Sequence, residues 1–265
     1  METSTASGGK SPVPARSVRG SHVVADCALR DDPLVGPLAL GPGESVPGDA
    51  FFLMVAEDRL ELRPPGEHGR AGVRADFPPD RGGGPSARSP LVRSFGPRIG
   101  RILDLTTGLG GDAYRLASAG YEVSGFERDP VVHALLASGW RAACESGAVP
   151  AEIASRLGFR LADGQQALEA ASGLDLGVYI DPMYPPPRRA SAKPRRALQV
   201  LRALLGEDLD AGALVDAARR VAARVVVKRP HHGESLRPDP DFVLSSKLVR
   251  FDVYVEPARM SARSR

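Results

Sequence analysis

Short apolar runs alternate with stretches of helical periodicity over most of the chain. The runs with the length and composition of buried strands lie at residues 102–105, 121–126, 159–161, 176–180 and 224–228. The stretches whose apolar positions fall on one helix face lie at residues 112–119, 129–140, 198–205 and 209–223. This alternation predicts an α/β fold with a mostly parallel twisted sheet. Two further runs at 242–244 and 247–255 predict a C-terminal antiparallel hairpin at its edge.

The part of the chain before this pattern divides into three stretches of different composition. Residues 1–20 are polar and low in apolar content, which predicts a disordered tail. Residues 51–55 and 59–62 have the pattern of a strand hairpin, so a small α/β annex is expected. A Gly/Pro/Arg-rich passage over residues 63–90 has the composition of a linker. We therefore expect a tail at 1–20, an annex and linker at 21–90, and the main domain at 91–265.

Composition excludes several classes of protein. The 265 residues are 42% apolar, which is enough to fill a core, and the formal net charge is only +3. Cys27 and Cys144 lie far apart without metal-ligand spacing, which suits the reducing cytoplasm, and the five histidines form no metal motif. No apolar run approaches the length of a membrane span. We expect a cytoplasmic globular protein with no metal site and no membrane association.

Glycines after the first predicted strand mark the first candidate site. Gly108, Gly110 and Ala113 satisfy the loose G-x-G-x-x-G/A pattern of nucleotide-binding turns, and Asp112 can cap the following helix. Asp104 lies just before the glycines, and Glu127 ends the next apolar run about twenty residues on, where ribose hydroxyls are usually bound. These residues indicate a cradle for a nucleotide-containing cofactor.

Acidic residues also end the next two predicted strands. Asp163 follows the third and Asp181 the fourth, so both belong to the edge where parallel sheets bind ligands. Pro182 and the prolines after Tyr184 would hold this segment rigid. The Asp181 carboxylate and the Pro182 carbonyl can accept hydrogens from an exocyclic amine while the base stacks on Tyr184. We therefore predict Asp181, Pro182 and Tyr184 as catalytic residues.

Five ordered blocks of sequence between residues 51 and 255 resemble the RsmJ family. They are Asp-Leu-Thr-Thr-Gly-Leu-Gly-Gly-Asp at 104–112, Glu-Arg-Asp-Pro-Val-Val at 127–132, Asp-Pro-Met-Tyr-Pro at 181–185, Val-Val-Val-Lys-Arg-Pro at 225–230 and Arg-Phe-Asp-Val-Tyr at 250–254. Members of that family are Rossmann-like class I methyltransferases that use S-adenosylmethionine (SAM) to methylate a guanine N2 of 16S ribosomal RNA.

The resemblance completes the set of predicted cofactor residues. It implies that SAM contacts Gly111, Asp112, Glu127, Arg128, Asp163, Gly164 and Asp181. The turn itself adds Asp104, Thr106, Gly108 and Gly110. The implied partner is 16S rRNA or the small ribosomal subunit.

Basic residues follow the predicted catalytic motif and suit an RNA partner. The candidates for phosphate contacts are Arg188, Arg189, Lys193, Arg195, Arg196, Lys228 and Arg229. Three alternatives stay open at this stage. The acceptor could be another exocyclic amine, such as adenine N6 or a small molecule; the glycine pattern also allows a nicotinamide-dependent oxidoreductase; and a non-catalytic RNA-binding factor could keep the same fold.

Overall fold

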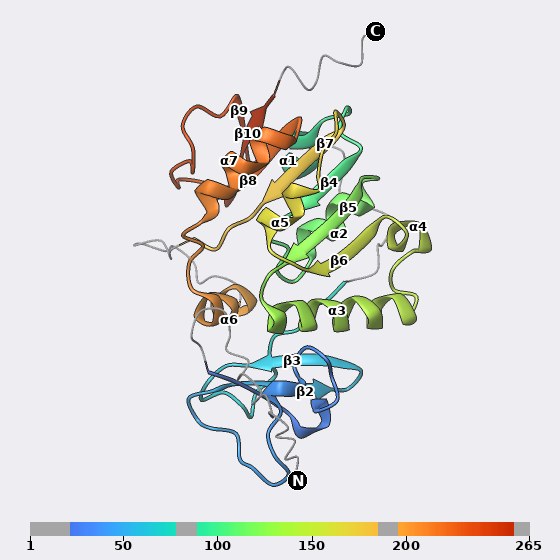
Figure 1. The fold of residues 1–265 in the computed structure, drawn as a ribbon, viewed down its shortest axis with the longest axis vertical. Coiled ribbons are helices and arrows are strands. Elements are labelled where there is room, and N and C mark those ends of the chain that lie inside the picture. Colours follow the sequence, from blue (N-terminus) through green and yellow to red (C-terminus); the bar gives the residue numbers. More distant parts are fainter. Residues whose placement is uncertain (1–21, 78–88, 185–195, 257–265) are drawn as a thin grey trace, which may run out of the picture.

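A computed structural model of the chain describes residues 22–77, 89–184 and 196–256, and Figure 1 shows its two sheets. The predicted tail at 1–20 lies outside these residues. Within them, the larger sheet has seven strands in the order β6-β5-β4-β7-β8-β10-β9. Its strands are β4 (Arg101–Asp104), β5 (Glu122–Glu127), β6 (Leu157–Leu161), β7 (Leu176–Ile180), β8 (Arg224–Pro230), β9 (Phe242–Ser245) and β10 (Val249–Val255).

The first five strands of this sheet are parallel, and β10 is antiparallel to both β8 and β9. The predicted mostly parallel sheet with a C-terminal antiparallel hairpin is therefore confirmed. Chain order reverses between β4 and β7, because β4 pairs with β5 on one side and with β7 on the other. A reversal of this kind leaves a crevice at the carboxyl ends of the strands, where open α/β sheets bind their ligands.

Helices cover both faces of the large sheet. The described α-helices are α1 (Pro90–Phe95), α2 (Gly111–Ser118), α3 (Pro130–Glu145), α4 (Ala151–Ala154), α5 (Gly164–Glu169), α6 (Arg196–Leu205) and α7 (Ala211–Val221), of which α6 packs with the annex and α3. Alternate residues of β7 belong to different cores: Val178 packs with the core under α5 and α7, and Tyr179 with the core under α1 and α2. All five β7 residues are buried, as expected of a central parallel strand.

The annex is a second sheet in the order β1-β2-β3, formed by β1 (Val23–Ala25), β2 (Phe51–Ala56) and β3 (Arg59–Arg63). β2 and β3 form the predicted hairpin, and β1 adds a parallel strand that the apolar pattern did not reveal. Its described helical segments are two single 3-10 turns, η1 (Cys27–Leu29) and η2 (Gly36–Leu38). The α-helices that pack on this sheet are α3, which follows β5 of the large sheet, and α6.

The annex has no separate core among the described residues. Leu53 and Leu62 of its hairpin pack in one buried cluster with Leu135 of α3 and Leu201 of α6. Figure 1 shows α3 and α6 lying between the two sheets. Burial of the annex therefore depends on helices from the rest of the chain, and the domain boundary between residues 90 and 91 stays a prediction. Within the described residues, no helix has both the length and the apolar character needed to cross a bilayer.

Candidate functional site

The predicted glycine turn connects the end of β4 to the start of α2. Gly108 has φ +56° and Gly110 has φ +81°, which is left-handed backbone that side chains other than glycine rarely adopt. A Cβ at Gly110 would lie 2.7 Å from Leu136 Cδ1, so this position is also closed by packing. A Cβ at Gly111 would meet nothing within 4 Å. The turn is therefore packed on its Gly110 side and open at Gly111.

Glu127 ties this turn to the end of β5. Its carboxylate accepts hydrogen bonds from Gly108 N (3.0 Å) and Asp129 N (2.8 Å), and the residue is only 6% exposed. Burial raises the pKa of Glu127 to about 7, because the low-dielectric surroundings disfavour the charged carboxylate. The predicted ribose-binding acid thus lies directly beside the glycine turn.

The residues after Glu127 hold the start of α3 and reach across to α7. Asp129 Oδ1 accepts from Val131 N and Val132 N and so caps α3, which begins with Pro130 as predicted. Arg128 donates to Asp208 (2.6 Å) and to Asp210. These acids keep the pKa of Arg128 above its usual value despite partial burial. Arg128 therefore connects the β5 end to the segment before α7.

Asp208 also holds the predicted acceptor motif. Its Oδ2 accepts from Met183 N (2.6 Å), and its own N donates to the Met183 carbonyl (2.9 Å). On the other side of the motif, Asp181 N donates to Thr106 Oγ1 at 2.7 Å. The segment after β7 is thus anchored both to the β4 turn and to the loop before α7.

Lys228 lies between two of the predicted cofactor acids. Its Nζ donates to Asp112 Oδ2 and to Asp181 Oδ2, both at 2.7 Å, and its side chain is 21% exposed. The Tyr179 hydroxyl donates to the same Asp112 oxygen at 2.7 Å. The two carboxylates hold the pKa of Lys228 well above its usual range, whereas burial raises the pKa of Asp181. The sequence predicted Lys228 as an RNA contact, but in the structure its ammonium group is bound to Asp112 and Asp181.

Asp104 lies beneath the cluster as a buried carboxyl group with 1% exposure. Burial raises its pKa well above the usual value, and the nearby charges of Asp112 and Asp181 act in the same direction. Its Oδ1 accepts from Thr106 N at 3.3 Å, which helps to shape the start of the turn. Asp104 therefore stabilises the start of the turn through its bond to Thr106.

Tyr184 follows at the outer end of the acceptor motif, where two guanidinium groups approach its ring. Arg202 Cζ lies 5.8 Å from the ring centroid and Arg229 Cζ lies 5.7 Å away, within cation–π distance. Burial raises the pKa of the Tyr184 hydroxyl, so it is neutral at physiological pH. An aromatic ring between cations is thus presented beside Asp181.

Most of the predicted site residues converge on this edge, and the others are more distant. Asp163 caps α5 by accepting from Gln165 N, and its Oδ2 lies 3.9 Å from Arg128. Gly164 packs against Leu105, where a Cβ would come within 3.0 Å. Arg196 begins α6 and pairs with Glu67 of the annex, away from the cluster. Arg188, Arg189, Lys193 and Arg195 lie outside the described residues.

Sequence reasoning missed two residues that organise the site. Tyr179 lies within the apolar run of β7, so the sequence predicts only a buried ring. The acidic partner of its hydroxyl, Asp112, lies 67 positions away in the chain. Asp208 precedes α7 in a pattern typical of a helix cap, yet its side chain binds the acceptor motif. Each side chain acts on a distant segment, so local spacing could not reveal either role.

The strand order, the glycine turn after β4 and the acid at the end of β5 define a Rossmann-like SAM-dependent methyltransferase. Residues 44–256 match the family described as "Putative SAM-dependent methyltransferase". A crystal structure of a SAM-dependent methyltransferase from Neisseria gonorrhoeae has the same fold, with TM-score 0.60 and 27% identity. The match covers 89% of this chain and 96% of that one.

Two curated relatives identify the family more closely. The ribosomal RNA small subunit methyltransferase J of Tolumonas auensis is 37% identical over 77% of this chain and 86% of the relative. The protein of the same name from Dechloromonas aromatica is 38% identical over 82% of this chain and 94% of the relative. The chain belongs to the ribosomal RNA small subunit methyltransferase J family, and the predicted resemblance is confirmed.

The residues at the carboxyl edge fit SAM, the cofactor of this family. SAM carries two cationic groups, a sulfonium and an ammonium, together with ribose hydroxyls that can donate hydrogen bonds. Among the described residues, Asp112 and Asp181 share the ammonium group of Lys228, and Arg115 also pairs with Asp112 Oδ1 at 3.0 Å. Glu127 offers a hydrogen-bond acceptor beside Gly108, and the backbone at Gly111 is open. Acceptor side chains at the strand ends and open backbone in the turn therefore match the hydrogen-bond donors of the cofactor.

Proposed function

We propose that this protein transfers a methyl group from SAM to the exocyclic N2 of a guanosine in small-subunit (16S) rRNA. The observation that carries the proposal is the position of Asp181 and Tyr184, which follow β7 opposite Glu127 across the switch in strand order. The names of the curated relatives support the rRNA substrate, and the acceptor motif supports an amine on an aromatic base. This substrate would place the enzyme with the ribosomes in the cytoplasm.

The cofactor half of the proposed site consists of the turn and the β5 end. When bound, SAM supplies an electrophilic methyl group for direct displacement by the amine. Glu127 would accept from the ribose hydroxyls, and the backbone from Gly108 to Gly111 would lie along the methionine part. Asp112, whose two oxygens are bound by Tyr179 and Lys228 on one side and by Arg115 on the other, would lie beside the methionine part. Arg128, Asp163 and Gly164 complete the proposed cofactor set.

The acceptor half consists of the segment after β7. Lys228 binds Asp181 Oδ2, and among the described residues no partner is bound to Oδ1, which can therefore accept from the substrate amine. The Pro182 carbonyl would accept the second amine hydrogen, and the base would stack on Tyr184. Such an amine is a poor nucleophile because its lone pair is delocalised into the ring. Alignment of donor and acceptor then supplies most of the rate enhancement.

The test is methyl incorporation from radiolabelled SAM into deproteinised small-subunit rRNA and into small subunits that lack the modification. Mass spectrometry of the digested RNA should find N2-methylguanosine at one position. If the label were found in methyladenosine or in a small molecule instead, the acceptor would be that amine and not guanine N2. Tight NADH binding without SAM binding would support an oxidoreductase. RNA binding with unchanged methylation in Asp181→Ala would contradict the catalytic assignment.

A further inference from the structure

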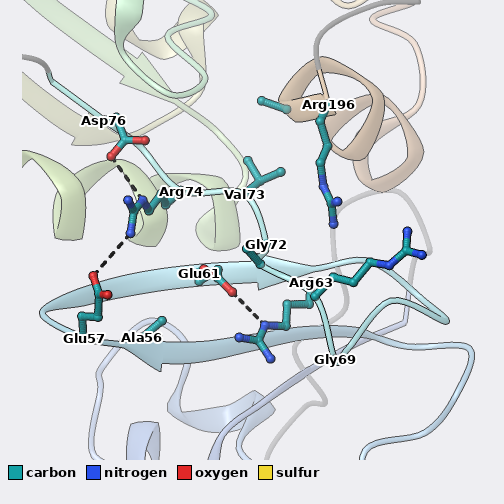
Figure 2. Close-up of a pocket in the computed structure, with 13 residues that line it drawn as sticks. Ala56, Glu57, Glu61, Arg63, Gly69, Gly72, Val73, Arg74, Asp76 and Arg196 are labelled. Carbon is teal, nitrogen blue, oxygen red and sulfur yellow. Dashed lines mark hydrogen bonds and ion pairs between the residues drawn. The ribbon is translucent and has the colours of Figure 1, made fainter.

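A cavity of about 590 Å³ lies in the annex, separate from the acid cluster. Its walls are the β2–β3 hairpin, the segment 69–76 and the start of α6 (Figure 2). The segment is fixed against β3 by paired hydrogen bonds between Leu62 and Val73, both 2.8 Å. Gly72 permits this approach, because a Cβ there would lie 2.4 Å from the Leu62 carbonyl oxygen. The cavity therefore has rigid walls; we refer to it as the annex groove.

The charges along the annex groove are unevenly distributed. Figure 2 shows Glu57, Asp76 and Arg74 toward one end, and Arg63 and Arg196 toward the other. Arg74 lies 3.6 Å from Glu57 and 3.3 Å from Asp76, so two acids hold it at the first end. The end next to α6 is the one where basic side chains predominate.

The arginines at the α6 end differ in how firmly they are held. Arg63 is bound to the buried Glu61 at 2.7 Å and to the His68 carbonyl, so its role is structural. Arg196 pairs with Glu67 at 2.9 Å, but both side chains are at least 40% exposed, and such surface pairs exchange readily. Arg70 is exposed and makes no side-chain ion pair or hydrogen bond with a described residue. Arg70 and Arg196 are therefore available to an anion.

Helix α6 connects this end of the groove to the acceptor motif. Arg196 lines the groove at the first residue of α6, and Arg202 of the same helix lies over the Tyr184 ring. Six residues of α-helix span about 9 Å along the axis. A strand of RNA whose base stacks on Tyr184 would thus pass the groove within a few nucleotides.

We propose that the annex groove binds the phosphodiester backbone of the RNA strand beside the target nucleotide, with Arg70 and Arg196 as its phosphate ligands. This inference rests on the proposed function, because it assumes an RNA substrate. Guanidinium groups match phosphate oxygens in a two-pronged geometry, and their planar fork loses less freedom per hydrogen bond formed than an ammonium group does. The annex then acts as the part of the enzyme that positions the strand.

The test compares Arg70→Gln and Arg70→Gln/Arg196→Gln with Arg156→Gln. Arg156 is exposed just before β6, does not line the groove, and serves as the matched control. We expect the KM for RNA to rise about threefold in the single variant and about tenfold in the double variant. The slope of log affinity against log salt should fall by about one for each arginine removed. The kcat at saturating RNA and the affinity for SAM should stay unchanged.

Filter binding of deproteinised small-subunit rRNA without cofactor separates this inference from the proposed function. Weaker binding with the lower salt slope supports the groove even if no methyl transfer is detected. Binding and salt dependence equal to those of Arg156→Gln would overturn it. A loss of affinity for assembled subunits alone, with naked RNA unaffected, would assign the groove to a ribosomal protein and would also overturn it.

Discussion

Lys228→Met is the substitution that most directly tests the electrostatics of the proposed site. Methionine keeps most of the side-chain volume but removes the ammonium group that donates to Asp112 and Asp181. Burial already raises the pKa of Asp181, and Lys228 and Asp112 act on it in opposite directions. Without the lysine, Arg115 would still pair with Asp112, but Asp181 would lose its cationic partner beside the buried Asp104.

The expected consequences follow from the burial of this group. Breaking a buried ion pair by removing one partner costs about 3–5 kcal/mol of stability. The lower end applies here, because Lys228 is 21% exposed and Asp181 is 30% exposed. The second consequence is chemical. The pKa of Asp181 rises further, so the carboxylate form, which is the stronger acceptor for the amine, is lost at a higher pH than in the parent enzyme.

The assay is the pH dependence of kcat with both substrates saturating. We expect the acid limb of the profile to move to higher pH in Lys228→Met, with activity falling about tenfold for each pH unit below the raised pKa. Lys228→Arg retains the positive charge and should restore the position of the limb. A purely structural role would lower the amount of folded enzyme without moving this limb. An unshifted acid limb in folded Lys228→Met protein would refute the electrostatic role.

Three further predictions concern the turn and its supports. Gly110→Ala should lower the free energy of unfolding by about 1–3 kcal/mol in thermal melts, since it combines left-handed backbone with a 2.7 Å approach to a leucine, whereas Gly111→Ala should leave it unchanged. SAM affinity measured by calorimetry should weaken as the pH falls below about 7, where Glu127 becomes protonated, and Glu127→Gln should abolish this dependence. Asp208→Ala should lower kcat more than it weakens SAM binding, because it releases the Met183 N–H of the acceptor motif, whereas Arg128 keeps its bonds to Asp210.

The sheet could be predicted because its central strands are largely buried on both faces and its helices on one. Continuous apolar runs therefore marked β5, β7 and β8, and the acids just after such runs marked the carboxyl edge. The helix start at Asp129 and Pro130 was equally visible, since capping depends on neighbours in the chain. These features are local, so hydropathy and turn chemistry were sufficient.

The features that the sequence did not reveal depend on contacts between distant segments. The sequence Lys-Arg-Pro at the end of a strand suggests a solvated rim, but Lys228 binds an aspartate 116 positions away in the chain. The annex hairpin was predicted, while the helices that pack on it belong to other parts of the chain. Hydropathy reports that a face is buried and not which element buries it. Partners at this range can be identified only from the folded structure.

The carboxyl edge is held together by backbone N–H groups that donate to side chains of neighbouring loops. Gly108 donates to Glu127, Asp181 donates to Thr106, and Met183 donates to Asp208, so each loop is fixed by the next. None of these bonds involves a ligand, so the cradle and the acceptor motif keep their relative position before anything binds. A displacement reaction without covalent catalysis depends on that alignment, because misplacement of about 1 Å can cost about a hundredfold in rate. Rigidity of this edge is therefore the main contribution that the fold makes to the proposed chemistry.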